Sequence, residues 1–121
     1  MRKERWKKSS KLKSFSAIKN LFEKGDSVSD YPVKILFQKV EEISLTQAGF
    51  SVSKKKYKNA VDRNRVKRQL REAYRKYRNE LPEDCTYHLM VMYIGQEQVE
   101  SRVISEKVKK LLNEISKKEV K

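Results

Sequence analysis

The chain has 121 residues, of which 30 are Lys or Arg and 16 are Asp or Glu, giving a formal charge of +14. This length suits one domain rather than a two-domain enzyme, and 3 Gly and 2 Pro exclude a collagen-like or linker-like chain. One cysteine excludes a disulfide framework, and no stretch approaches the roughly 18 apolar residues of a membrane-spanning helix. No apolar segment follows the basic N-terminus, so a secretory signal is not expected. We expect a cytoplasmic, single-domain protein with a polyanionic partner and no membrane contact.

The positive charge is confined to two segments. Residues 1–13 carry a net charge of +6 and residues 54–78 a net charge of +10, while the remaining residues sum to −2. Such blocks create a local positive potential that attracts phosphate backbones. The alternative, charge kept for solubility alone, is less well supported because solubilising surfaces usually intersperse both signs.

The first half of the chain predicts an arm, a helix and two strands. Residues 1–12 lack apolar periodicity and predict a flexible basic arm, so that the domain proper covers residues 13–118. A helix is expected from Ser14 to Gly25, and residues 26–31 are turn-like, with at most a short edge strand at Val28. Pro32 marks the start of a strand over 33–40, and a second strand covers 48–53.

The second half predicts a long basic helix, a strand and a final helix. Asn59 is the expected N-cap of a helix over 60–78 whose core side carries Val66, Leu70, Ala73 and Tyr77, flanked by Tyr74. The opposite side is a stripe flanked by Lys67: Asn64, Arg68, Arg71, Arg75 and Arg78. Residues 87–94 have strand length, although a buried helix is the alternative, and residues 104–115 have helical periodicity.

The arginine stripe favours phosphate binding. Like charges at helical spacing repel by a few tenths of a kcal/mol per pair, and Glu72 relieves only part of that repulsion. Phosphates would neutralise the rest, and guanidinium groups suit bidentate contacts. The alternative is a solvated helix face.

A series of motifs in this region resembles the pattern of a known family. The strand Gly49-Phe50-Ser51-Val52-Ser53-Lys54-Lys55 is followed by Asn59-Ala60-Val61 and by the helix start Arg63-Asn64-Arg65-Val66-Lys67-Arg68, with Arg71-Glu72 one turn later. This series closely resembles the signature of the bacterial ribonuclease P protein subunit. Weaker similarity, including Phe22 and Gly25, extends over nearly all of the chain except the basic arm.

The resemblance implies an α+β fold, a single-domain α-β-β-β-α-β-α sandwich like the second domain of ribosomal protein S5. It also implies a left-handed βαβ crossover before the last strand, although most such crossovers are right-handed.

The resemblance further implies that the chain assists a catalytic RNA in removing the 5′ leader of precursor tRNA. The protein would be monomeric, one copy per ribonuclease P RNA, with no catalytic residue, no metal site and no cofactor of its own; Mg²⁺ would act through the RNA subunit. The residues that would bind the RNA subunit are Arg63, Asn64, Arg65, Lys67, Arg68, Arg71, Arg75, Lys54 and Lys55. The cleft for the precursor's leader would comprise Phe15, Ile18, Phe22, Lys34, Leu36, Ser51 and Ser53.

The chain departs from the family at three places. Ile18 and Leu36 stand where many members have aromatic residues, which reduces the surface for base stacking, unless Phe15 substitutes. An arginine common after the last strand is absent from residues 93–96. Trp6 in the arm is more simply read as an unstructured tail residue than as a base-stacking one.

No catalytic set is evident elsewhere. His88 and Cys85 lack two further metal ligands and predict a structural histidine, and the carboxylate pairs Glu41-Glu42 and Glu83-Asp84 predict solvated surface. Two alternatives to the ribonuclease P subunit remain: a ribosomal or general RNA-binding protein of the same fold, and a protein-only nuclease, which the missing catalytic set disfavours.

Overall fold

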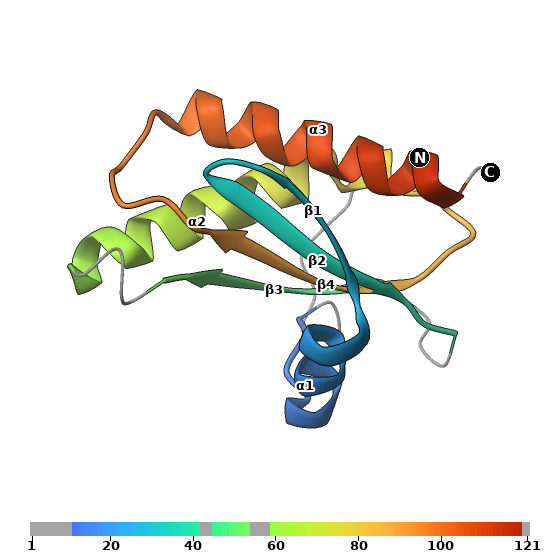
Figure 1. The fold of residues 1–121 in the computed structure, drawn as a ribbon. Helices are drawn as coiled ribbons and strands as arrows, with labels where there is room; N and C mark the ends of the chain where they lie inside the picture. Colours follow the sequence, from blue (N-terminus) through green and yellow to red (C-terminus); the bar gives the residue numbers. More distant parts are fainter. Residues whose placement is uncertain (1–10, 42–44, 54–58, 120–121) are drawn as a thin grey trace.

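A computed structural model describes residues 11–41, 45–53 and 59–119 (Figure 1). Its elements follow the order α1 (Phe15–Lys24), β1 (Asp26–Asp30), β2 (Val33–Lys39), β3 (Gln47–Val52), α2 (Ala60–Tyr77), a short 3-10 helix η2 (Arg78–Glu80), β4 (Tyr87–Tyr93) and α3 (Ser101–Glu119). This is the expected α-β-β-β-α-β-α order, so the predicted α+β fold class is confirmed. None of the helices within these described ranges is both long enough and apolar enough to cross a bilayer.

The four strands form one sheet in the order β1-β2-β4-β3. β2 is antiparallel to both β1 and β4, whereas β3 and β4 are parallel neighbours. Parallel neighbours need a crossover, and α2 supplies it. The handedness of this crossover stays a prediction.

Helices α2 and α3 cover one face of the sheet, and α1 lies on the other (Figure 1). The main core lies under α2 and α3, because alternate strand residues such as Val33, Ile35 and Val91 point to that face and are fully buried. A smaller cluster under α1 joins Leu12, Leu21 and Met90. The two faces of the sheet therefore have different roles, one inside the core and one partly open.

The segment before β2 differs from the sequence expectation. Residues 26–30 form a complete edge strand rather than a turn with a short strand, because Val28 is buried and pairs with Ile35 across the hairpin. Only Tyr31 and Pro32, joined by a cis peptide bond, form the turn. Polar residues around Val28 concealed this strand, because one apolar side chain gives no alternating pattern to predict it from.

Two ion pairs join strand β1 to helix α3. The carboxylate Oδ2 of Asp30 lies 3.2 Å from Nζ of Lys110 and 3.3 Å from Nζ of Lys107. The hydrogen bonds from Lys110 and Lys107 lower the pKa of Asp30 from its ordinary value of 3.8. The ion pairs therefore favour the folded state when Asp30 is ionised.

This pairing predicts a pH-dependent loss of stability upon replacement of Asp30 by Asn. Because the folded pKa is lower than the unfolded one, wild type should exceed Asp30→Asn in stability at pH values above about 4. The difference should shrink as the pH falls through the folded pKa of Asp30. Urea unfolding of both proteins from pH 7 to pH 2.5 measures it, and a difference that is the same at every pH would contradict the assignment.

Candidate nucleic-acid interface

Helix α2 forms where the sequence predicts it and has one core face. Oδ1 of Asn59 accepts hydrogen bonds from the backbone N–H groups of Val61 and Asp62 at 2.9 and 3.2 Å, which caps the helix. Its buried residues recur at helical spacing: Val66, Leu70, Ala73 and Tyr74. This face fixes the helix on the sheet and turns the remaining residues outward.

Of the two tyrosines of α2, Tyr74 rather than Tyr77 is the fully buried one. Tyr74, expected on the flank, is only 2% exposed and meets the Phe50 ring edge to face at 5.8 Å. Burial raises the pKa of Tyr74. Tyr77, expected in the core, is half-buried; its ring packs against the core and the ammonium groups of Lys76 and Lys109 lie over it. The position of β3 beneath α2 decides which ring is buried.

The outer side of α2 carries an exposed cationic face. Asn64, Arg65, Arg68 and Arg75 are exposed, and among the described residues no carboxylate forms an ion pair with Arg65 or Arg68. Arg75 pairs with Glu72 at 2.6 Å, the partial relief that the sequence predicts. Unpaired guanidinium groups on one face favour a phosphate-bearing partner.

The remaining predicted cations are less exposed. Arg63, Lys67 and Arg78 are half-buried, and Arg71 lies over the Phe50 ring with its guanidinium carbon 6.0 Å from the ring centroid. Packing on Phe50 restricts the Arg71 side chain and so favours one direction of approach. Lys54 and Lys55 lie outside the described residues, so the structure does not test them.

The chain before α1 adds a second basic surface. The backbone N–H of Leu12 donates to the carbonyl of Ala48 at 3.1 Å, and Leu12 is buried. Lys11 and Leu12, the last residues of the predicted arm, therefore pair with β3, and residues 1–10 lie outside the described part of the chain. A pocket of about 220 Å³ opens between this segment, β3 and α2, and its charged lining is entirely cationic: Lys11, Lys13, Lys67 and Arg71.

The face of the sheet away from α2 and α3 carries the residues predicted for the leader. The strand register puts Lys34, Met92 and Ser51 in one row across β2, β4 and β3, and Leu36, Met90 and Gly49 in the next. Ser53 follows β3 directly, and its N–H donates to the carbonyl of Tyr93 at 3.4 Å. All four predicted sheet residues are half-buried. The topology thus brings Lys34, Leu36, Ser51 and Ser53 to one face.

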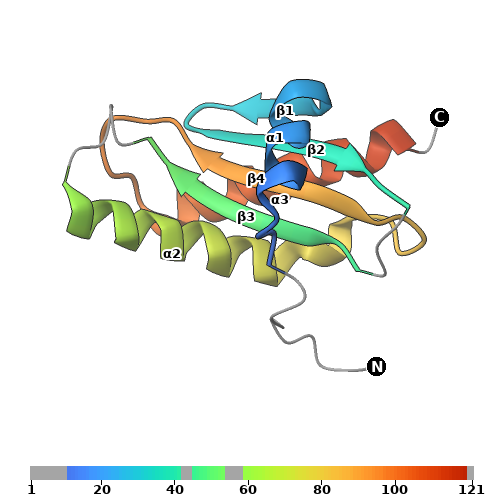
Figure 2. The ribbon, with the colours of Figure 1, turned by 90° about the horizontal axis from the view of Figure 1, so that it is seen from below.

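Helix α1 crosses this face from the β3 side to the β1 side (Figure 2). Ser14 caps it by accepting from the N–H of Ala17, and Leu21 anchors it with no exposed surface. Phe15 and Phe22 are 81% and 51% exposed. Large exposed aromatic rings beside a strand row are available for stacking with bases.

Ile18 and Leu36 have a packing role that their places in the sequence do not reveal. Both lie against the cluster of Leu12, Leu21 and Met90 under α1. Their aliphatic side chains hold α1 on the sheet, and the exposed stacking surface of α1 comes from Phe15 and Phe22.

Two methionines of β4 also belong to this face, although no sequence motif singles them out. Met90 is buried under α1, and half-buried Met92 lies between Lys34 and Ser51 in the strand register. The signal was present, because the period of two within residues 87–93 puts His88, Met90 and Met92 on the same side.

Within the part of the chain that the structure describes, residues with catalytic or metal-binding side chains do not converge. Cys85 Sγ donates to Oδ1 of Asp84 at 3.7 Å, and His88 is half-buried in β4. Glu41, Glu83 and Asp84 are exposed, while Glu42 lies outside the described residues. No group of three His, Cys, Asp or Glu residues that could hold a metal ion occurs within the described residues.

The comparison with protein families is decisive. The family model for ribonuclease P matches residues 6–116, nearly the whole chain. This chain belongs to the ribonuclease P protein family.

Curated relatives agree with the family. The ribonuclease P protein component of Chlorobium phaeobacteroides is 37% identical over 99 residues, which cover 69% of this chain and 68% of that protein. The corresponding component of Porphyromonas gingivalis is 37% identical over 70 residues, covering 56% of this chain and 51% of its own length.

Solved ribonuclease P proteins share the fold. A Staphylococcus aureus ribonuclease P protein mutant, described as defective in mRNA degradation, superposes with a TM-score of 0.76 at 26% identity, covering 91% of this chain and 90% of that one. The Thermotoga maritima protein has a TM-score of 0.73 at 24% identity, and the match covers 86% of this chain and 96% of that one. The four-stranded sheet with three helices is thus the family's fold.

Proposed function

We propose that this chain is the RNA-binding protein subunit of ribonuclease P and assists removal of the 5′ leader from precursor tRNA. One observation carries the proposal: within a ribonuclease P protein, α2 presents Arg65 and Arg68 exposed and without carboxylate partners among the described residues. This face supports binding to the catalytic RNA. The residues that we assign to it are Arg63, Asn64, Arg65, Lys67, Arg68, Arg71 and Arg75, with Lys54 and Lys55 carried over from the family.

The leader is assigned to the opposite side of the sheet. Exposed rings on α1 can stack with unpaired bases, Lys34 can neutralise a phosphate, and Ser51 leaves room for a strand because its side chain is small. Ring stacking and charge neutralisation do not depend strongly on base identity, so we expect little sequence preference in the leader.

The protein contributes position and charge to the reaction. When bound by the RNA subunit, Mg²⁺ supplies the activated water and stabilises the leaving oxygen. The chain's own cations offset repulsion between the two RNAs, which lowers the Mg²⁺ concentration that assembly requires. One protein monomer per RNA subunit is enough to supply both the cationic face of α2 and the leader-binding face of the sheet.

Reconstitution tests the proposal. The chain, a bacterial ribonuclease P RNA and a 5′-labelled precursor tRNA are combined at low Mg²⁺, where the RNA alone cleaves slowly. We expect faster cleavage at the mature 5′ end, and no comparable gain with polylysine of similar charge. Cleavage no faster than with RNA alone would refute the proposal, and cleavage without any RNA subunit would indicate a protein-only nuclease.

A further inference from the structure

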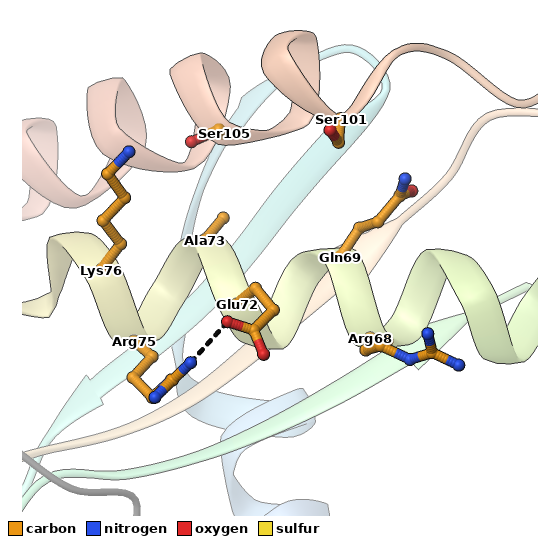
Figure 3. Close-up of a pocket in the computed structure, with 8 residues that line it drawn as sticks. All are labelled: Arg68, Gln69, Glu72, Ala73, Arg75, Lys76, Ser101 and Ser105. Carbon is orange, nitrogen blue, oxygen red and sulfur yellow. Dashed lines mark hydrogen bonds and ion pairs between the residues drawn. The ribbon is translucent and has the colours of Figure 1, made fainter.

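Between α2 and α3 lies a groove of about 570 Å³ that shares only Arg68 and Arg75 with the predicted RNA face (Figure 3). Both helices line it, α3 with residues near its start. The lining residues are Arg68, Gln69, Glu72, Ala73, Arg75, Lys76, Ser101 and Ser105.

The lining side chains of α2 form two sets: those that point toward α3 are the wall of the groove, and those that point away from α3 are its rim. Gln69, Ala73 and Lys76 point toward α3, whereas Arg68, Glu72 and Arg75 point away from it (Figure 3). The small side chain of Ala73 leaves the middle of the wall open. Three cations face one carboxylate here, and that carboxylate is already paired with Arg75 at 2.6 Å. The groove thus retains a net positive charge at Lys76 and Arg68.

A polar atom without a partner lies within this groove. Oε1 of Gln69 is buried, and no group in the described part of the chain donates a hydrogen bond to it. A buried acceptor left unsatisfied costs about 1–3 kcal/mol, so a ligand that donates to Oε1 when the Gln69 side chain turns into the groove is favoured. Across the groove, Ser101 and Ser105 lie in the first turns of α3, where the helix dipole is positive.

We infer that this groove binds one ribose-phosphate unit of the ribonuclease P RNA. Lys76 would contact the phosphate, and Oε1 of Gln69 would accept a hydrogen bond from a ribose 2′-hydroxyl, which DNA lacks. The inference rests on the proposed function and deepens it, because it extends the RNA contact from the outer face of α2 to the groove between α2 and the start of α3.

An RNA fits this groove better than an acidic peptide does. Arg68 belongs both to the groove and to the exposed cationic face, so one RNA backbone can follow the two surfaces without interruption. A backbone unit also supplies the anion and the hydroxyl donor together.

A matched pair of lysines tests the phosphate contact. Nζ of Lys76 and Nζ of Lys109 lie over the same Tyr77 ring, 5.3 and 5.5 Å from its centroid, but only Lys76 lines the groove. Lys76→Gln should weaken binding to the ribonuclease P RNA roughly three- to tenfold and reduce the slope of log K against log salt by about 1. Lys109→Gln should leave both nearly unchanged. Equal effects of the two variants would show that only overall charge matters and would overturn the inference.

Interference mapping with 2′-deoxynucleotides tests the hydroxyl contact. Wild type should show a position in the RNA at which one 2′-deoxy substitution weakens binding, and Gln69→Leu should abolish that interference while retaining the wild-type circular dichroism spectrum. Interference that persists in Gln69→Leu would contradict the inference. Competition by polyglutamate that displaces the RNA from wild type but not from Lys76→Gln would also contradict it, because the groove would then prefer an acidic peptide. If wild type fails in the low-Mg²⁺ cleavage assay, the proposed function fails; if it succeeds and the lysine variants behave alike, only the groove assignment fails.

Discussion

Replacing Arg68 with glutamate should weaken binding of the ribonuclease P RNA by about ten- to a hundredfold. A hydrogen bond to a charged group contributes about 1.5–3 kcal/mol, and reversal of the charge adds repulsion with the phosphate. Arg68 is exposed, so unfolding free energy should change by only about 0.5 kcal/mol or less. Binding titrations at several salt concentrations measure both the affinity and its salt dependence.

Two controls separate a local contact from overall charge. Lys118→Glu changes the net charge by the same amount at an exposed site on α3 and should have a much smaller effect. Arg68→Lys keeps the charge but loses the bidentate geometry, so its affinity should fall between those of wild type and Arg68→Glu. Unchanged affinity and salt slope in Arg68→Glu would remove this residue from the interface.

Replacing Leu21 with alanine should release α1 from the sheet. Leu21 has no exposed surface and anchors the small cluster with Leu12 and Met90. Truncation of a buried leucine costs about 2–5 kcal/mol of unfolding free energy, because it loses contacts and leaves a cavity. Chemical denaturation monitored by circular dichroism measures the loss.

Phe22→Ala is the matched control on the same helix. Its ring is 51% exposed, so its removal should cost about 1 kcal/mol or less of stability. It should nevertheless reduce the preference for precursor tRNA over leaderless tRNA by roughly tenfold, since base stacking contributes about 1–3 kcal/mol. A large loss of stability in Phe22→Ala, or an unchanged preference for the leader, would contradict the division of α1 into an anchoring side and a binding side.

Much of this protein follows from local sequence signals. The Asn59 cap, the apolar spacing from Val66 to Ala73 and the arginines between them place α2 and its charged face without any tertiary information. The same holds for β2, where alternation separates Val33 and Ile35 from Lys34. These features depend on period and capping, which act between residues close in the chain.

Local signals of this kind do not predict the full length of strand β1 or the pairing of Leu12 with Ala48. Residues 26–30 are polar apart from Val28, and Leu12 stands in a basic segment, yet both side chains are buried by partners distant in sequence. The pairings become evident only when Ile35 and Ala48 are in place.

By itself, therefore, the sequence determined the helices, the main strands, the location of the positive charge and the family to which the chain belongs. Only the tertiary structure decided which tyrosine of α2 is buried, that Ile18 and Leu36 anchor α1, and that Gln69, Lys76 and Ser105 line one groove. The physical reason is that periodicity specifies which face of an element is apolar, whereas the neighbour that covers or leaves open each face depends on contacts between distant segments.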